Sequence, residues 1–217
     1  MKQQVIAQIE AHKIIAIVRG VDPAACVKVA QALYDGGIRL MEITFNQKDP
    51  STFAATAASI SALRTEYEGR MCIGAGTVLS VQQAEQAAAA GAQYIISPDA
   101  DPEVIRRTCA LGLVSIPGAM TASEIKAAHS AGADFVKLFP ISELGPGYVR
   151  ALRAPLGHIR MLAVGGINEH NAADFLRAGA CGLGVGGNLA NREWIAAGAF
   201  EKITQTAQAL VESIQNI

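Results

Sequence analysis

One pattern repeats along the chain and limits the folds available to it: a helical, alanine-rich stretch, a break containing glycine, and then a short apolar run. Glycine is favoured just past a helix end because the chain often turns there through positive φ. Short apolar runs bounded by such breaks are typical of strands buried on both faces. Eight strands are therefore expected, over residues 14–18, 38–45, 72–75, 94–97, 113–116, 135–139, 161–164 and 183–185.

Helical patterns separate these strands, with Asp22, Ser80 and Thr121 as expected N-caps. Strands that alternate with helices pair in parallel through right-handed crossovers. At 217 residues this predicts an α/β chain with one domain, residues 1–217, folded as a (β/α)8 TIM barrel with a short N-terminal helix over residues 1–10. The alternative is an open doubly wound sheet, but Arg19-Gly20-Val21-Asp22-Pro23 is not the glycine-rich dinucleotide loop that such a sheet would need after its first strand.

Composition argues against several classes of function. Apolar residues make up 51% and charged residues 17%, and the formal net charge is -1 without a run of Lys or Arg, so nucleic acid and anionic membranes are not expected partners. No apolar run approaches the ~18 residues of a membrane span, and the N-terminus does not have the pattern of a signal peptide. The four cysteines and four histidines are scattered without metal-ligand spacing. We therefore expect free thiols, no metal and a cytoplasmic location.

Three charged side chains stand where the expected strands should face the barrel interior. Side chains along a barrel strand point alternately inward and outward. In Asp134-Phe135-Val136-Lys137-Leu138-Phe139-Pro140 this alternation directs Lys137 into the barrel mouth, and in the first two expected strands it directs Arg19 and Glu42 inward. A buried ion pair among these groups is the structural alternative, but buried pairs are costly to form and contribute little to stability. The ordinary pKa of lysine is about 10.4, and burial that lowers it to about 7–8 makes the amine a competent Schiff-base nucleophile.

Glycine pairs follow the last two expected strands. Barrels often bind phosphate with these two loops and a short extra helix, because glycine lets backbone N–H groups approach the phosphate oxygens. Asn188 or Asn191 is expected to open such a helix before Trp194. Thr77, after the third strand, is expected to hydrogen-bond a ligand, with a turn or helix cap as the alternative. The predicted phosphate-binding residues are Gly165, Gly166, Gly186, Gly187 and Asn188.

Together these residues resemble the Schiff-base aldolases for 2-keto-3-deoxy-6-phosphogluconate (KDPG) and its relatives. The resemblance runs from about residue 14 to the last helix, and its anchors are residues 15–19, 42–45, 74–79, 96–98, 116–118, 136–140, 165–166 and 186–187. It implies that Lys137 forms the Schiff base, that Glu42 is the acid/base, and that Arg19, Thr77 and Pro98 lie at the pyruvate end. It also implies a phosphorylated 2-oxo sugar acid as substrate, no cofactor, and a homotrimer.

The implied reaction releases pyruvate and glyceraldehyde 3-phosphate from the lysine adduct. Asn46 stands where some gluconate-type members have Arg, and Val164 where they have Thr, whereas members that act on the galactonate epimer share Asn and Val. Asn188 replaces a Ser found in some members. Asn46 and Val164 are expected to lie near the C4 hydroxyl of the substrate, and we call them the hydroxyl region. They predict that the galactonate epimer (KDPGal) is cleaved at least as efficiently as KDPG. Three alternatives stay open: 4-hydroxy-2-oxoglutarate cleavage as main or second activity, a non-covalent phosphosugar isomerase or synthase, and a phosphosugar-binding barrel.

Overall fold

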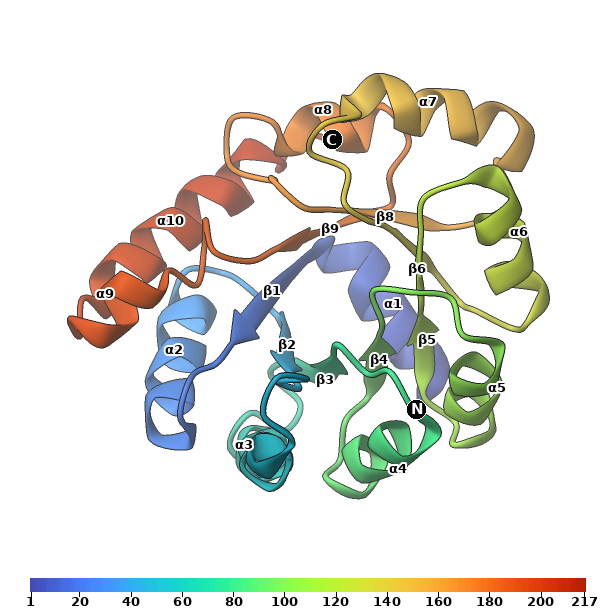
Figure 1. The fold of residues 1–217 in the computed structure, drawn as a ribbon. Helices are drawn as coiled ribbons and strands as arrows, with labels where there is room; N and C mark the ends of the chain where they lie inside the picture. Colours follow the sequence, from blue (N-terminus) through green and yellow to red (C-terminus); the bar gives the residue numbers. More distant parts are fainter.

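The computed structural model describes residues 1–217 and shows parallel strands wound into a barrel with helices around it (Figure 1). The strands pair in the order β5-β4-β3-β2-β1-β9-β8-β7-β6. Their bounds are β1 (Ile14–Arg19), β2 (Leu40–Thr44), β3 (Cys72–Gly76), β4 (Tyr94–Ile96), β5 (Val114–Ile116), β6 (Gly118–Ala119), β7 (Val136–Leu138), β8 (Met161–Val164) and β9 (Gly182–Val185). The predicted barrel is confirmed, with nine strands in place of eight.

The additional strand arises because Pro117 interrupts the fifth one. Proline has no backbone N–H to donate to a neighbouring strand. β5 pairs with β4 on one side of this break, and β6 pairs with β7 on the other. The carbonyl of Pro117 still accepts a hydrogen bond from the N–H of Lys137 at 2.8 Å. The two segments therefore join the ends of the sheet and bring Lys137 to the barrel wall.

Helices cover the outside of the barrel (Figure 1). The expected caps are confirmed, because Asp22, Ser80 and Thr121 each accept a backbone N–H from the first turn of the helix that follows. None of the helices has the length and apolar content that crossing a membrane requires. The helices are α1 (Lys2–His12), α2 (Pro23–Asp35), η1 (Pro50–Thr52), α3 (Phe53–Glu66), α4 (Val81–Ala89), α5 (Pro102–Ala110), α6 (Ala122–Ser130), α7 (Gly145–Leu156), α8 (Ala172–Arg177), α9 (Arg192–Ala196) and α10 (Phe200–Ser213).

Alternation along the strands divides the buried apolar residues into two clusters. The outer cluster lies between strands and helices, and the inner one fills the barrel. The N-terminal helix α1, expected over residues 1–10, belongs to the inner cluster through its apolar face and crosses the barrel behind the strands in Figure 1. The inner cluster consists of Val5, Ile6, Ile9, Ile15, Leu40, Cys72, Tyr94, Ile96, Val114, Ile116, Phe135, Leu162 and Val164.

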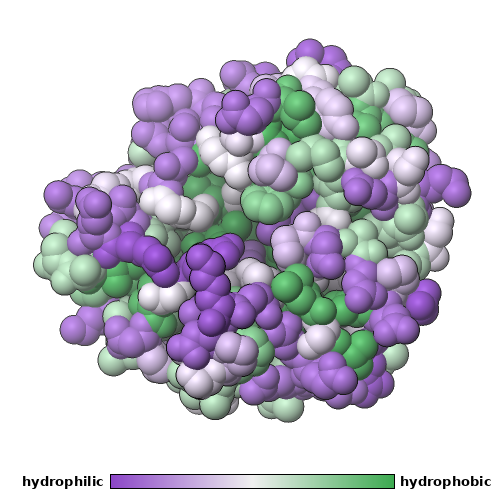
Figure 2. All heavy atoms as spheres, in the orientation of Figure 1, coloured by the Kyte–Doolittle hydropathy of each residue, from purple (hydrophilic) through white to green (hydrophobic).

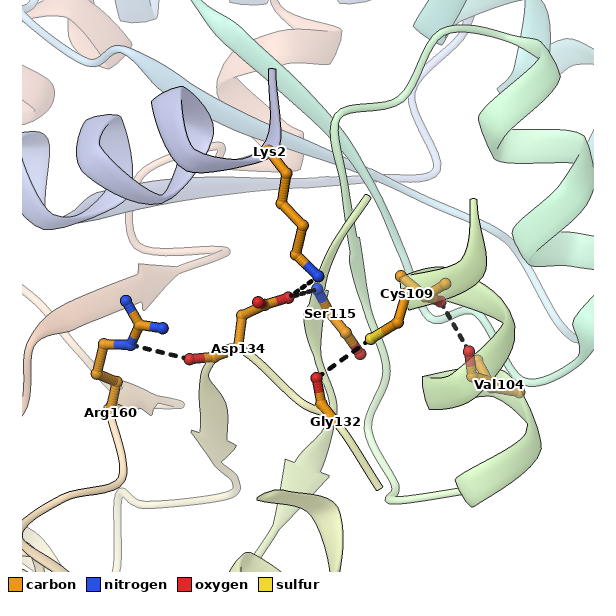
Figure 3. A network of polar contacts seen from close by, with 8 residues as sticks. Lys2, Val104, Cys109, Ser115, Gly132, Asp134 and Arg160 are labelled. Atoms are coloured by element: carbon orange, nitrogen blue, oxygen red, sulfur yellow. Dashed lines mark hydrogen bonds and ion pairs between the residues drawn. The ribbon is translucent and has the colours of Figure 1, made fainter. Parts of the chain in front are cut away.

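Polar contacts attach α1 to the barrel (Figure 3). Lys2 Nζ lies 2.9 Å from Asp134 Oδ2, and the same oxygen accepts a hydrogen bond from the backbone N–H of Ser115 at 2.8 Å. Arg160 donates to the carbonyl of Asp134 at 3.0 Å and pairs with Glu10 of α1 at 3.1 Å. These contacts and the apolar face of α1 close the amino-terminal end of the barrel, so ligands enter from the opposite end.

Candidate active site

A cavity of about 420 Å³ opens where β1, β7, β8 and β9 end. In Figure 2, which has the orientation of Figure 1, hydrophilic residues form most of the outline and apolar residues show nearer the centre. Active sites of this fold are built at the carboxyl ends of the strands. The cavity is lined by Ile17, Arg19, Lys137, Phe139, Val164, Gly165, Gly166, Ile167, Gly184, Gly186, Gly187, Asn188, Ala190 and Arg192.

Lys137 lines this cavity from the middle of β7 and is only 5% exposed. Burial lowers the pKa of its amine because the charged form loses hydration; the Arg19 cation lowers it further, and the Glu42 carboxylate opposes the shift. Its Nζ lies 4.6 Å from the centroid of the Phe139 ring. The inward direction expected from alternation is confirmed, and the result is an amine that is neutral more often than an ordinary lysine.

Glu42 lies on β2 and is 1% exposed. Neither of its carboxylate oxygens has a hydrogen-bond partner in the protein, so the alternative of a self-satisfied buried pair with Lys137 or Arg19 is not what the structure contains. Burial raises the pKa of the Glu42 carboxyl, and the charges of Lys137 and Arg19 oppose that shift. A buried carboxyl with a raised pKa and free oxygens is suited to accept and return a proton.

Arg19 ends β1 beside Thr44 of β2, and its exposed side chain lines the cavity. The Thr44 hydroxyl is the third buried polar group that no protein atom hydrogen-bonds, after the two Glu42 oxygens. All three unpartnered atoms lie on the inward face of β2, at positions 42 and 44. Unpaired buried polar atoms are rare in folded proteins, so their clustering marks this face as a site for a ligand or substrate.

The two glycine loops follow β8 and β9, as the sequence predicts. The physical reason for glycine differs between the two loops. Gly165 and Gly166 have φ of 108° and 71°, in the left-handed region that other residues rarely adopt. Gly186 and Gly187 have no positive φ, and a Cβ added at Gly187 would meet nothing within 4 Å. Their small size instead leaves the cavity open between the loops.

The two asparagines that follow the second glycine pair have separate roles. Asn188 does not cap α9; its side-chain N–H donates to the carbonyl of Ile167 at 2.9 Å and so ties the two glycine loops together. Asn191 caps α9 by accepting from the N–H groups of Glu193 and Trp194 at 2.8 and 3.2 Å. The predicted short helix is therefore confirmed with Asn191, the second of the two candidates, as its cap.

Four predicted site residues do not line the cavity: Glu42, which is buried on β2, and Thr77, Asn46 and Pro98, which follow the ends of β3, β2 and β4. Thr77 follows β3 with φ of 54°, a conformation rare for a β-branched residue. Asn46 follows β2 and lines a neighbouring cavity of about 410 Å³. Pro98 follows β4, and its carbonyl packs so closely on Gly118 that a Cβ added there would lie 2.3 Å from it.

Arg192 is a cavity residue that sequence reasoning missed. It begins α9, and its Nε donates to the carbonyl of Arg19 at 3.3 Å. Its guanidinium occupies the space beside Gly20, where an added Cβ would lie 2.2 Å from one of its nitrogens. Its only sequence signal is its place shortly after the second glycine pair. With Arg192 included, the cavity lining carries three cationic side chains and no carboxylate, which favours an anionic ligand.

The site holds an amine of lowered pKa near a buried carboxyl, at a cavity whose charges favour anions, and an aldolase that acts through a lysine needs such groups. The fold and the site place the protein in the class of carbon–carbon lyases built on a (β/α)8 barrel. The chain belongs to the KDPG and KHG aldolase family, whose family model matches residues 5–206. The family expected from the sequence is thereby confirmed, and the synthase and binding-barrel alternatives are not supported.

Two relatives and one solved structure illustrate the similarity. The chain is 37% identical to the 2-dehydro-3-deoxy-6-phosphogalactonate aldolase of Escherichia coli K12, over 92% of this chain and 93% of the relative. It is 39% identical to the 2-dehydro-3-deoxy-phosphogluconate aldolase of Treponema pallidum, over 87% of each. The crystal structure of KDPG aldolase from Legionella pneumophila, with pyruvate captured as a covalent carbinolamine intermediate, matches with a TM-score of 0.83 at 25% identity, over 94% of this chain and 96% of that one.

Proposed function

We propose that this chain is a class I aldolase that cleaves KDPGal, KDPG or both to pyruvate and D-glyceraldehyde 3-phosphate. The observation that carries the proposal is the buried Lys137 with its lowered pKa, near a Glu42 carboxylate that no protein group hydrogen-bonds. A neutral, partly desolvated amine is the nucleophile that Schiff-base chemistry requires. The covalent pyruvate in the Legionella pneumophila relative supports the same chemistry here.

The proposed reaction begins when Lys137 Nζ attacks the C2 carbonyl carbon, and loss of water from the carbinolamine gives a protonated imine. Glu42 then takes the proton of the C4 hydroxyl, the C3–C4 bond breaks, and its electron pair moves toward the imine to form an enamine as the aldehyde leaves. Protonation at C3 and hydrolysis release pyruvate and restore the amine. The raised pKa of Glu42 suits a group that both accepts and returns a proton.

The charges of the cavity suit the two ends of this substrate, a carboxylate at C1 and a phosphate at C6. We assign Arg19, with Thr77 and Pro98, to the pyruvate end. Arg192 and the two glycine loops serve the phosphate, because a guanidinium and converging backbone N–H groups both bind phosphate oxygens. Asn188 contributes by holding the loops together through its bond to Ile167.

The hydroxyl region around Val164 and Asn46 bears on the choice of epimer. KDPGal and KDPG differ in the orientation of the C4 hydroxyl, beside the bond that breaks. Val164 is 5% exposed and offers only methyl groups to the cavity. Because this side chain has no hydrogen-bonding group that one epimer would satisfy and the other would leave unpaired, it does not discriminate against either epimer. We propose that KDPGal is cleaved at least as efficiently as KDPG, as the similarity to the Escherichia coli relative also favours.

Measuring kcat/KM for KDPGal, KDPG and 4-hydroxy-2-oxoglutarate tests the substrate proposal. We expect both phosphorylated sugar acids to react far more efficiently than 4-hydroxy-2-oxoglutarate, and inorganic phosphate to compete with them. Arg192→Gln should lower kcat/KM for the phosphorylated substrates about tenfold, the loss of one charged contact of about 1.4 kcal/mol, and leave 4-hydroxy-2-oxoglutarate unaffected. Arg177→Gln, an exposed arginine on α8, is the matched control.

Equal kcat/KM for all three substrates would reject the phosphate site, and a higher kcat/KM for 4-hydroxy-2-oxoglutarate would make its cleavage the main activity. For the epimers, Val164→Thr restores a hydroxyl and should shift the ratio of kcat/KM toward KDPG. A strong wild-type preference for KDPG that the substitution does not move would refute the role of this position.

Two further parts of the proposal concern the whole protein. We propose that it acts as a homotrimer and in the cytoplasm, as the family resemblance and the composition predict. Sedimentation equilibrium at several concentrations tests the first part, with an expected mass near three times that of the 22.6 kDa chain. A mass that stays at one chain would exclude the trimer.

A further inference from the structure

The loop that follows β3 is held by side chains from three other parts of the barrel. The loop runs from the end of β3 at Gly76 to the start of α4 at Val81, and the N–H of Val78 bonds the carbonyl of Ile96 in β4 at 3.2 Å. Three further hydrogen bonds join the loop to side chains: Gln47 Nε2 donates to the carbonyl of Thr77 at 2.5 Å, Ser97 Oγ donates to the carbonyl of Val78 at 2.7 Å, and the N–H of Leu79 donates to Gln83 Oε1 at 2.7 Å.

Gln47 and Gln83 also bond to each other, with Gln83 Nε2 donating to Gln47 Oε1 at 3.0 Å. Each of the two amides accepts one hydrogen bond through its oxygen and donates one through its nitrogen. The bonds form a chain in which the N–H of Leu79 donates to Gln83, Gln83 donates to Gln47, and Gln47 donates to the carbonyl of Thr77. Gln83 is only 5% exposed, and Gln47 is half-buried. Both ends of this chain of hydrogen bonds lie on the loop after β3, at Leu79 and Thr77. The Gln47–Gln83 pair therefore holds these two residues of the loop in one fixed arrangement.

Thr77 has the backbone conformation that most needs such support. Its φ is 54°, and the only other non-glycine residue with positive φ is Lys13, at the end of α1, where a left-handed residue is common. A β-branched residue with positive φ persists only when its surroundings hold it there. Gln47 donates directly to the carbonyl of Thr77. The direction of that carbonyl depends on the backbone angles of Thr77, so the hydrogen bond restrains the left-handed conformation.

We propose that Gln47 and Gln83 are positioning residues that hold Thr77 in its left-handed conformation and thereby set the affinity of the pyruvate end. The proposal rests on the proposed function, which assigns Thr77 to that end. It also joins two active-site loops, because Gln47 directly follows Asn46 after β2 whereas Thr77 follows β3. A change in the Gln47–Gln83 pair therefore alters pyruvate binding without touching Lys137 or Glu42.

The test measures trapping of pyruvate by borohydride, as the half-saturating pyruvate concentration and the maximal rate, in Gln47→Met, Gln83→Met and the double variant. Each single substitution should raise half-saturation about tenfold with the maximal rate within about twofold of wild type, and the double variant should be no worse than either single one. Gln47→Glu, which still accepts from Gln83 but cannot donate to Thr77, should behave like Gln47→Met. Gln82→Met, exposed on the same helix, is the matched control.

Unchanged half-saturation in the Gln47 variants would overturn the proposal, whatever their thermal stability, because a merely structural role lowers stability and leaves pyruvate affinity as it was. Additive losses in the double variant would likewise contradict a single connected pair. If Gln83→Met does not fold, the two substitutions at the half-buried Gln47 decide the question. Failure of wild type to trap pyruvate at all would instead reject the proposed aldolase, and is thereby distinguished from failure of the Gln47–Gln83 pair.

Discussion

Lys137 and Glu42 show how one environment shifts two ionisable side chains in opposite directions. Burial penalises the charged form of each, so it lowers the pKa of the amine and raises that of the carboxyl. Each charge partly offsets the shift of the other, and Arg19 opposes the rise at Glu42 while adding to the fall at Lys137. The neutral amine and the proton-accepting carboxylate are thus both accessible between the ordinary pKa values of about 4.3 and 10.4.

The rate of pyruvate trapping should depend on pH accordingly. Only the neutral amine attacks, so the rate should rise with pH and level off above the lowered pKa of Lys137, with a midpoint below the ordinary value of about 10.4. Glu42→Gln removes the carboxylate that raises this pKa, so its midpoint should move to still lower pH. A midpoint at the ordinary lysine value in both proteins would contradict the account of the site.

The directions of Lys137, Glu42 and Arg19 were predictable from alternation alone, because a strand turns every second side chain to the same face. The contributions of Arg192 and Gln47 were not. Arg192 bonds a carbonyl 173 positions earlier, and Gln47 bonds one 30 positions later. Such contacts depend on how loops from different strands meet at the mouth, and no local pattern records that.

At the scale of elements, several inward positions of β3 and β9 are glycines that make room for large side chains of neighbouring strands. A Cβ at Gly74 would lie 2.1 Å from the Tyr94 ring, and one at Gly184 would lie 2.8 Å from Val164. A Cβ at Gly76 would lie 1.6 Å from Glu42 Oε1. Gly74 and Gly76 of β3 therefore accommodate Tyr94 and Glu42.

Gly76→Ala should therefore displace the Glu42 carboxylate. We expect kcat to fall about 10²-fold or more, within the range for loss of a general acid/base, while pyruvate is still trapped on Lys137. Gly147→Ala, where an added Cβ meets nothing within 4 Å, should leave kcat unchanged. Wild-type turnover in Gly76→Ala would show that the barrel interior adjusts without cost and that the position of Glu42 is not fixed by this glycine.

At the scale of the whole molecule, the barrel is closed at one end by α1 and open at the other, where the site lies. Most of this architecture was predictable, since eight apolar runs separated by helical patterns leave few alternatives. The division of the fifth strand at Pro117 was not predicted, because the pairing of Gly118–Ala119 with β7 depends on closure of the barrel. The sequence placed a short helix at the N-terminus but did not reveal that its apolar face fills the barrel interior.

Ile9→Ala tests that role of α1. Ile9 is fully buried and belongs to the inner cluster, so its truncation should lower the free energy of unfolding by about 2–5 kcal/mol, as measured by denaturant titration. KM and kcat should change little at temperatures where the variant stays folded, because the site lies at the opposite end. Gln3→Ala, exposed on the same helix, is the control for helix effects. A loss of unfolding free energy below about 0.5 kcal/mol is typical of a surface substitution, and it would contradict the role of α1 in the core.

The most direct test of the central claim is mass spectrometry of the protein after borohydride reduction with pyruvate. We expect a stable adduct on the peptide that contains Lys137, and none in Lys137→Met. Glu42→Gln should still form the adduct while its kcat falls about 10²–10⁴-fold, because in the proposed mechanism Glu42 takes its proton after Lys137 has formed the imine. An unmodified Lys137 peptide in the wild-type protein would contradict the lysine-dependent mechanism.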